Sequence, residues 1–462
     1  MVPRITDPAI LAGYLTDASN THGSAEALLR PESAEEVAEI LAYCQDHAIP
    51  LTVTAQRTST TGGPVPKGGW LLSTERLNRV LSIDGQHAEA EAGVLLGAFQ
   101  DEIERRSLFY PPDPTSRNEC SLGGSIACNA SGARTYRYGP TRPWVEELQI
   151  ALPDGTLLRA DRDTPIPADW PRPQWNEPKV KTAAGIYPAT NLMDLFIGQE
   201  GMLGVITRAR VRLIPLPARV FSVWVFFPSA RAGLAFVAQL RGSQTLSPRL
   251  IEWFDANSLD LIRQRVPELP PQARAAVWCE QECEDSSADP LIEAWAAEID
   301  GSEALQDTTV FADDAAGMER LRQLRHALPA GVNELISRSG LPKVGTDFAV
   351  PDAGLATLMA AYEAVPMRHV LFGHIGDNHL HLNLLPQSQA ELIQARQIWA
   401  ELFRLAISLG GTVSAEHGIG KLKRQYLAEM VGEETLGTFR ALKRRLDPNW
   451  ILGRDTMIDA PV

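Results

Sequence analysis

The sequence predicts an α+β protein made of two main regions that differ in composition. Up to about residue 217, glycine-rich loops interrupt short strands and helices. Beyond Phe221, strand-like stretches alternate with amphipathic helices, and few glycines interrupt them before residue 373. We expect this second region to form an antiparallel sheet with helices on one face. The expected boundaries are 1–217, 218–410 and a C-terminal segment, 411–462.

Local signals place several elements within these regions. Ser33 and Glu36 have the spacing of a helix capping box, so a helix should begin there. A β-hairpin should turn at Asp154-Gly155. In the second region, Ala315 to Leu328 has helical periodicity, and Pro329 should end that helix.

Composition and charge exclude several classes of protein. The chain has 462 residues, 44% hydrophobic and 22% charged, which is typical of a globular enzyme of about three domain-sized units. The formal net charge of -14 argues against a nucleic-acid partner, since phosphate binding needs a basic surface. The N-terminus lacks the layout of a signal peptide, and no apolar run reaches 18 residues. Five scattered cysteines fit a reducing compartment, so we expect a cytoplasmic protein without a membrane span.

Three glycine-rich loops offer backbone to a ligand. Residues 55–66 follow a strand, are rich in hydroxyls and end in Gly62-Gly63, so they offer N–H and hydroxyl donors to an anion. An ordinary surface loop is equally compatible with this segment alone. Residues 111–132 are rich in proline and small residues, which permit close approach of the backbone to a large ligand. Residues 194–207 form the third loop and run into an alternating strand.

Four of the nine histidines lie in two short segments, 373–383 and 416–418. The first segment reads as a hairpin turning at Gly376-Asp377-Asn378, which should place His374 opposite His381 on the two arms. His379 lies on the return arm, nearer the turn. Glu416 can join from a distant loop, and two histidines with one glutamate and an open position are typical of catalytic zinc sites. The alternative is a buried polar hairpin whose histidines bond to backbone carbonyls.

Taken together, these motifs identify a family resemblance. Pro-Pro-Asp-Pro-Thr-Ser at 111–116, Leu-Gly-Gly-Ser-Ile-Ala at 122–127 and Gly-Gln-Glu-Gly-Met-Leu-Gly-Val-Ile at 198–206 carry it with the two histidine segments. The chain resembles FAD-linked dehydrogenases of the vanillyl-alcohol-oxidase-type fold, in the branch of D-lactate, glycolate and D-2-hydroxyglutarate dehydrogenases. The resemblance implies a bilobal FAD-binding domain, formed by 1–217 and 411–462, plus an antiparallel α+β cap domain that carries the substrate.

The resemblance also assigns cofactor-binding residues. The expected contacts to non-covalently bound FAD are Thr58, Ser59, Thr60, Thr61, Gly62, Gly63, Pro112, Asp113, Thr115, Ser116, Gly123, Gly124, Ser125, Ala127, Asn129, Ser131, Gly132, Glu200, Gly204, Val205 and Ile206. The sequence departs from the family in four places. Ala55-Gln56-Arg57 replaces a glycine-rich start of the first loop, Gln199 stands where serine is common, Gly453-Arg454 replaces Asn-Pro, and His379 replaces an asparagine.

The resemblance implies a chemistry as well. His374, His381 and Glu416 are the expected ligands of a divalent metal, zinc in the first place, with manganese or iron as alternatives. His417 is the expected general base, on the argument that its side chain diverges from that of Glu416 in an extended loop.

Two further residues are expected to contact the substrate. Asn383 is expected to donate to a substrate oxygen, and Arg325 to bind the substrate carboxylate. Lys343 is a weaker candidate for the same carboxylate.

The expected reaction is the oxidation of a D-configured 2-hydroxy acid to the 2-oxo acid, with hydride passing to FAD. The electron acceptor is open between an electron-transfer flavoprotein, a cytochrome and a quinone, and so is peripheral membrane contact through that acceptor. Two alternatives are a flavin-binding subunit of a multi-subunit glycolate oxidase and, in last place, a metallohydrolase. The sequence does not identify the acid or the oligomeric state.

Overall fold

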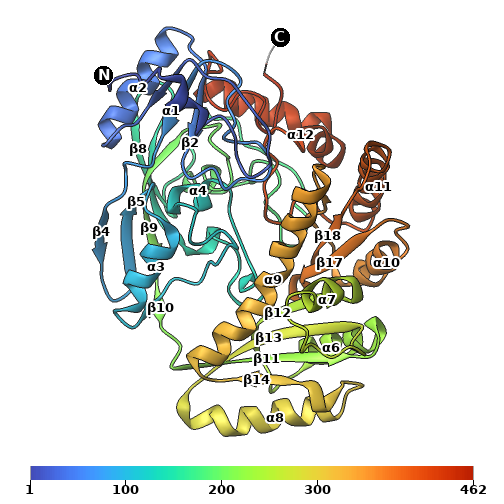
Figure 1. The fold of residues 1–462 in the computed structure, drawn as a ribbon. Helices are drawn as coiled ribbons and strands as arrows, with labels where there is room; N and C mark the ends of the chain where they lie inside the picture. The colour runs from blue at the N-terminus through green and yellow to red at the C-terminus, as the bar shows by residue number, and fades with distance from the viewer. Residues whose placement is uncertain (1, 461–462) are drawn as a thin grey trace.

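The computed structural model describes residues 2–460, and Figure 1 shows an N-terminal part beside a second part that holds the largest sheet. A small parallel sheet has the order β1-β3-β2, and an antiparallel five-stranded sheet has the order β4-β5-β9-β7-β8. The strands and helices of this part are β1 (Ala27–Leu29), β2 (Leu51–Thr54), β3 (Trp70–Ser73), β4 (Val80–Ile83), β5 (His87–Glu91), β6 (Leu108–Phe109), β7 (Val145–Ala151), β8 (Leu157–Asp161), β9 (Val205–Arg212) and β10 (Ile214–Pro215), with α1 (Pro8–Ala12), α2 (Ala34–Asp46), α3 (Leu96–Glu104), α4 (Leu122–Ala127) and α5 (Thr135–Tyr138).

Two local predictions in this part are confirmed. The hydroxyl of Ser33 accepts a hydrogen bond from the Glu36 backbone N–H, so Ser33 caps α2. The β7–β8 hairpin turns through Gly155, whose φ of 85° lies in the left-handed region that favours glycine.

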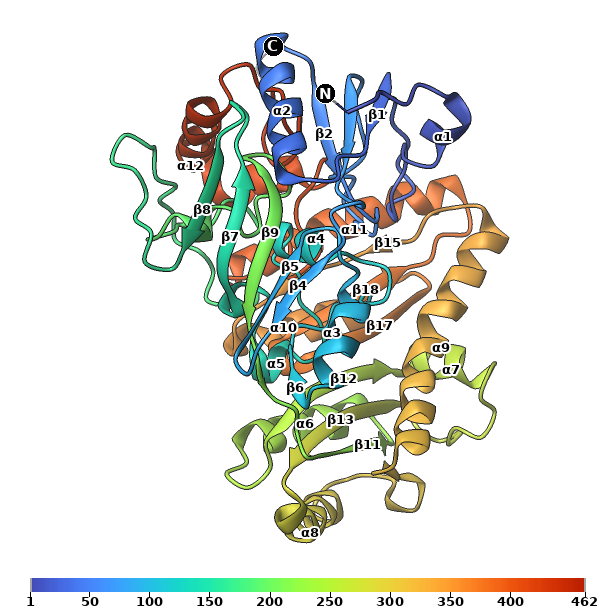
Figure 2. The ribbon, with the colours of Figure 1, turned by 90° about the vertical axis from the view of Figure 1, so that its left-hand side faces the viewer.

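The second part is built on an antiparallel eight-stranded sheet, whose strands β12, β13 and β11 follow one another in the lower half of Figure 2. Its order is β14-β11-β13-β12-β17-β18-β15, and β16 also pairs with β18. The strands and helices are β11 (Arg219–Phe227), β12 (Pro248–Asp255), β13 (Ala275–Cys283), β14 (Val310–Ala312), β15 (Val344–Gly345), β16 (Phe348–Ala349), β17 (His369–His374) and β18 (His379–Leu384), with α6 (Ala230–Gly242), α7 (Ala256–Arg263), α8 (Ala288–Asp300), α9 (Ala315–Ser339), α10 (Asp352–Glu363) and α11 (Gln389–Ser408).

The expectation of helices on one face of this sheet is wrong, because both faces are covered. Phe221 and Val225 of β11 pack in one cluster with Phe236 of α6. Trp224 and Phe226 of the same strand pack in another cluster, which contains apolar residues of α7 and α9. Since successive residues of a strand point to opposite faces, the continuous apolar run of β11 is typical of a strand buried on both sides.

The expected helix end at Pro329 is also wrong. Helix α9 continues through Pro329 to Ser339. Proline removes one backbone hydrogen bond inside a helix. The burial of Leu321, Leu328 and Val332 in one cluster on both sides of the proline offsets that loss.

The C-terminal segment returns to the N-terminal part. Helix α12 (Arg424–Leu446) is bent at Gly432 and lies near α2 in both views (Figures 1 and 2). Past this helix, the Leu51 N–H donates to the Ile451 carbonyl at 2.8 Å. The domain boundaries given above stay a prediction. Within residues 2–460, no helix has the length and apolar character needed to cross a membrane.

Candidate active site

The register of the β17–β18 hairpin differs from the expected one. His374 pairs with His379, and His381 pairs with Phe372, so His374 does not lie directly opposite His381. The cause is the turn, because a short 3₁₀ segment (Ile375–Asp377) and a left-handed Asn378 make 374 and 379 the last pair of the ladder. Directly paired residues share a face of the sheet, as do residues two apart on one strand. The three imidazoles therefore lie on the same face.

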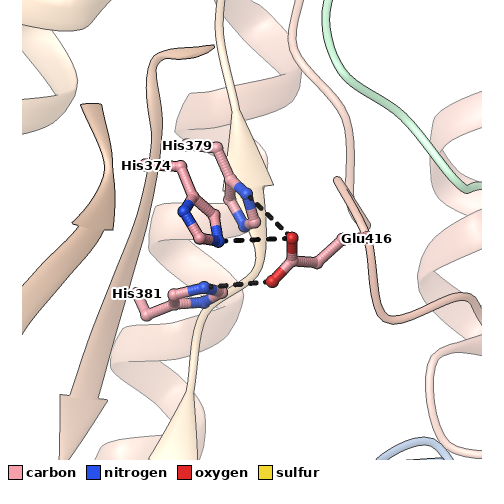
Figure 3. Close-up of side chains that lie close together, drawn as sticks. All are labelled: His374, His379, His381 and Glu416. Atoms are coloured by element: carbon pink, nitrogen blue, oxygen red, sulfur yellow. Dashed lines mark ion pairs between the residues drawn. The ribbon is translucent and has the colours of Figure 1, made fainter. Parts of the chain in front are cut away.

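Glu416 faces these three imidazoles from the C-terminal segment, as Figure 3 shows. The distance from His374 Nε2 to Glu416 Oε2 is 3.4 Å, and from His381 Nε2 to Glu416 Oε1 it is 3.3 Å. His379 Nδ1 is 3.8 Å from Oε2. One ligand atom of each residue lies within 4.8 Å of all the others. The structure therefore brings together the three ligands expected from the sequence and adds His379.

This arrangement fits a divalent metal ion. Two ligands bound at about 2.1 Å and at tetrahedral angles lie about 3.4 Å apart, which is longer than a hydrogen bond and close to the separations above. His374 Nε2 is buried and has no hydrogen-bond partner in residues 2–460. Its Nδ1 is hydrogen-bonded to the Glu252 carboxylate, and His381 Nδ1 lies 3.3 Å from the Thr346 carbonyl oxygen. Metal-binding histidines are held in this way by an acceptor on the outer nitrogen.

Lys181 is a site residue that the sequence did not reveal. Its side chain is 3% exposed, and its Nζ is 2.8 Å from Glu416 Oε2 and 3.9 Å from Asp377 Oδ2. Burial by itself would raise the pKa of the Glu416 carboxyl, but Lys181 and His374 hold it well below the usual range. Glu416 is therefore ionised, as a metal ligand must be. Lys181 lies in a long loop without periodicity, so no sequence signal pointed to it.

Asp347 is a second residue that the sequence missed. Its buried carboxylate accepts hydrogen bonds from the Ser414 hydroxyl at 2.6 Å, Lys423 Nζ at 2.7 Å and the backbone N–H groups of Glu416 and His417. Burial alone would raise the pKa of Asp347, but the opposite effect of His417 and Lys423 is larger and holds the pKa well below its usual value. The carboxylate is therefore ionised. Asp347 thus fixes the loop that carries Glu416 and His417.

His417 lies beside Glu416, and the expected divergence of the two side chains is wrong. His417 Nε2 is 3.8 Å from Glu416 Oε1, and its ring stacks on His381 at a centroid distance of 5.3 Å. The turn at Gly418, with φ of 76°, allows this approach. His417 Nδ1 lies 3.5 Å from Asp347 Oδ2. Burial lowers the pKa of His417 to about 4, so the ring is neutral at pH 7 and able to accept a proton.

The remaining candidates lie at different depths around this cluster. Arg325 is buried on α9, and its Nε is 3.6 Å from Glu252, which also holds His374. Asn383 is 1% exposed on β18, and its Nδ2 has no hydrogen-bond partner in the described chain. Lys343 is exposed just before β15. Arg325 is therefore linked to the cluster through Glu252, another residue that the sequence analysis did not select.

The three glycine-rich loops meet one another and the C-terminal segment. The Glu200 carboxylate accepts the backbone N–H groups of Ile419 and Gly420, both at 2.8 Å. The Glu200 N–H donates to the Ala127 carbonyl at 2.8 Å, and the Lys421 N–H donates to the Thr61 carbonyl at 2.9 Å. Gly132 packs against Asp113 so closely that a Cβ would lie 2.0 Å from its carbonyl oxygen. Residues from all three loops therefore surround one place.

This place fits the phosphate part of a dinucleotide. Among residues 2–460, the backbone N–H groups of Ser59, Thr60 and Gly63 donate to no protein acceptor, so they stay available to an anion. The structure places other expected residues differently. Val205 and Ile206 are buried in strand β9, and Thr115 is exposed. The individual flavin contacts stay predictions.

Comparisons with known proteins agree with this geometry. Residues 25–161 match the family model described as "FAD binding domain", and residues 216–456 match "FAD linked oxidases, C-terminal domain". The glycolate oxidase subunit GlcD of Bacillus subtilis (strain 168) is 28% identical, over 96% of this chain and 91% of its own length. A D-lactate dehydrogenase of Anaerostipes hadrus is 27% identical, over 92% of this chain and 88% of its own.

A further relative covers nearly the whole chain, and a solved structure shares the fold. The D-2-hydroxyglutarate dehydrogenase of Xanthomonas citri pv. viticola is 30% identical, over 99% of this chain and 95% of its own. The structure of an alkyldihydroxyacetonephosphate synthase superimposes with a TM-score of 0.73 at 16% identity, over 97% of this chain and 81% of that one. This similarity confirms the vanillyl-alcohol-oxidase-type FAD fold predicted from the sequence. The chain belongs to the FAD-linked oxidases and is an FAD-dependent oxidoreductase.

Proposed function

We propose that this protein oxidises a D-configured 2-hydroxy acid to the 2-oxo acid at the cluster formed by His374, His381 and Glu416. The observation that carries the proposal is the convergence of buried imidazole nitrogens on one ionised carboxylate. The names of the relatives support the substrate class, because glycolate, D-lactate and D-2-hydroxyglutarate are all 2-hydroxy acids.

Two bound groups would supply the reactivity. A divalent ion held by His374, His381 and Glu416 would polarise the substrate hydroxyl as a Lewis acid, with zinc the first candidate and manganese or iron the others. Non-covalently bound FAD would accept the hydride. The donor set of imidazole nitrogens and one carboxylate suits the ion, and the free N–H groups of the first loop suit the FAD phosphates.

The residues of the chain bind the acid and take up its proton. His417 Nε2 accepts the hydroxyl proton, while Asp347 near Nδ1 orients the ring and stabilises the imidazolium. Arg325 and Lys181 are buried cations that attract the substrate carboxylate. Asn383 lies two residues from His381 on the same strand face, and its unpaired Nδ2 donates to a substrate oxygen.

The test has two steps. The purified protein should be yellow and should release FAD on acid precipitation, because no covalent attachment is expected. D- and L-2-hydroxy acids are then added anaerobically, and flavin absorbance is followed, with a dye acceptor for turnover. At least one D-acid should bleach the flavin, and a chelator should slow the reaction. Failure of every acid to reduce the flavin of metal-loaded protein would sink the proposal.

A second candidate is that the chain acts as the flavin subunit of a larger oxidase. It is favoured by the word "subunit" in the name of the Bacillus subtilis relative. Turnover by the purified chain alone with a dye, but not with an electron-transfer flavoprotein, a cytochrome or a quinone, would support this candidate. The metallohydrolase alternative does not account for the family membership.

A further inference from the structure

His379 is the imidazole of the cluster that the proposed function does not use. It stands where related enzymes were expected to have asparagine, and it is fully buried at 0% exposure. We propose that His379 Nδ1 is a fourth ligand of the metal site, which then offers three imidazoles and one carboxylate. This inference rests on the proposed metal site and extends it.

The position of the ring carries the first part of the argument. His379 Nδ1 is 3.8 Å from Glu416 Oε2, on the side of the carboxylate that also faces His374. A separation of 3.8 Å is too long for a hydrogen bond, yet it is close to the spacing of two ligands around one ion. The His379 ring lies 4.5 Å from the His381 ring and 5.3 Å from the His374 ring, centroid to centroid. All three rings thus surround the same point.

The outer nitrogen of His379 carries the second part. Its Nε2 is 2.9 Å from Asp347 Oδ1, a carboxylate that other donors already hold in place. This contact is an ion-pair distance outside hydrogen-bond geometry, but a proton on Nε2 is still favoured beside the carboxylate, and it leaves the lone pair on Nδ1, 3.8 Å from Glu416 Oε2. The opposite tautomer would set a lone pair against Asp347 at 2.9 Å. His374 and His381 have hydrogen-bond acceptors on their outer nitrogens, and His379 has a carboxylate within 2.9 Å of its own, which resembles the arrangement of metal-binding histidines.

The unpaired inner nitrogen carries the third part. His379 Nδ1 is buried and has no hydrogen-bond partner among residues 2–460. A lone pair that faces a carboxylate oxygen without water is unfavourable unless a cation lies between them. Lys181 Nζ lies 2.8 Å from Glu416 Oε2, but it does not donate to His374 Nε2 or to His379 Nδ1. An ion would satisfy His374, His379 and the carboxylate together.

A third imidazole has consequences for the choice of metal. Imidazole nitrogen suits zinc, copper, iron and nickel, whereas manganese and magnesium prefer oxygen ligands. Replacing His379 by the family residue asparagine should therefore weaken zinc binding more than manganese binding. Loss of an outer partner of a ligand typically costs 10–100-fold in affinity, so loss of a ligand should cost about 100-fold or more.

The experiment measures metal binding in the absence of substrate. Wild type, His379→Asn and the control His369→Asn are stripped with a chelator and titrated with Zn²⁺, Mn²⁺ and Co²⁺ while the visible Co²⁺ bands are recorded. His369 is a half-buried histidine on the same hairpin whose Nδ1 lies 2.8 Å from the Met367 carbonyl, so its loss should change nothing. Flavin content and the melting temperature show whether each variant is folded.

A second variant tests the proposal by the gain of a spectroscopic signal rather than by a loss of affinity. In His379→Cys, a thiolate would stand close to the place of Nδ1, because the longer metal–sulfur bond compensates for the shorter side chain. If position 379 binds the ion, the Co²⁺ form should gain a near-ultraviolet thiolate-to-metal band. We expect that band in His379→Cys and a loss of Zn²⁺ affinity of about 100-fold in His379→Asn. Wild-type affinity and Co²⁺ bands in His379→Asn would overturn the role of His379 alone. No metal binding by wild type would overturn the metal site of the proposed function as well.

Discussion

Single buried carboxylates hold the cationic and imidazole side chains of this site in position. Glu252 is 0% exposed and lies between His374 and Arg325. Burial alone would raise the pKa of Glu252, but the opposite effect of His374 and Arg325 is larger, and the net pKa lies below its usual value. Glu252 is therefore ionised. The negative charge of Glu252 thus attracts both the His374 ring and the Arg325 guanidinium. The position of Arg325 is therefore coupled to that of the metal-site histidine.

Arg325→Ala should lower kcat/KM for the acid by roughly ten- to hundredfold, mainly through KM. The reason is the loss of a charge-assisted bond to the substrate carboxylate, which is worth about 1.5–3 kcal/mol. Flavin content should not change. The matched control is Arg320→Ala, an exposed arginine on the same helix. Kinetics equal to wild type with every accepted acid would show that Arg325 serves only to pair with Glu252.

Glu416→Ala and His417→Ala separate a ligand from a base. Glu416→Ala should lose metal and activity together. His417→Ala should keep most of its metal but lose about 10²–10⁴-fold in kcat, which is the typical contribution of a general base. Because His417 Nε2 lies only 3.8 Å from the Glu416 carboxylate, metal analysis of both variants is needed. Equal metal loss in the two variants would make His417 a ligand.

Glu177 gives a pH dependence that is independent of the active site. Burial raises its pKa to about 7. Between its usual pKa of 4.5 and 7, the folded chain holds more protons at this group than the unfolded chain, so its contribution to stability falls as pH rises through this window. Glu177→Gln should therefore raise the melting temperature relative to wild type at pH 8 and not at pH 5. Exposed Glu268→Gln is the control, and an equal shift at both pH values would contradict the argument.

At the scale of elements, the sequence predicted whether a segment forms a helix or a strand better than it predicted which other elements that segment pairs with or packs against. The capping residue Ser33, the hairpin at Gly155 and the strand nature of β17 and β18 depend on local preferences, and these predictions are confirmed. The register of β17 and β18 depends on which residues form the turn, and composition does not specify this. The second covered face of the large sheet depends on which helices pack there, a property of the folded chain.

Helix α9 shows how packing overrides a local preference. Pro329 lies inside the helix, where proline is about 3 kcal/mol less favourable than alanine. Pro329→Ala should restore the backbone hydrogen bond to Arg325 and raise the free energy of unfolding by about 1–3 kcal/mol. Thermal and urea unfolding measure the change. Ala330→Pro, at the exposed next position, should do the opposite, and a less stable Pro329→Ala would mean that the helix needs its proline.

At the scale of the whole molecule, the site is assembled from segments far apart in the chain. Lys181, Asp347 and Glu416 come from three different segments, and only Glu416 stood in a recognisable motif. Sequence motifs mark residues that touch a cofactor, whereas Asp347 holds the loop of Glu416 and His417, and Lys181 pairs with Glu416. Their roles depend on distances that the folded chain alone defines.

The C-terminal segment should therefore decide whether the protein keeps its flavin. Gly420 has φ of 53°, and a Cβ there would lie 2.2 Å from the Thr61 carbonyl oxygen of the first loop. Gly420→Ala should force the two segments apart, disturb the Glu200 bond to the Gly420 N–H and lower the FAD content of the purified protein. Gly437→Ala is the matched control, because a Cβ in that part of α12 meets nothing within 4 Å. A ligand present at a free concentration of 100 times its Kd stabilises the folded protein by about 2.7 kcal/mol. Added FAD should therefore raise the melting temperature of the control more than that of Gly420→Ala. Full flavin occupancy in Gly420→Ala would show that the C-terminal segment does not shape the FAD site.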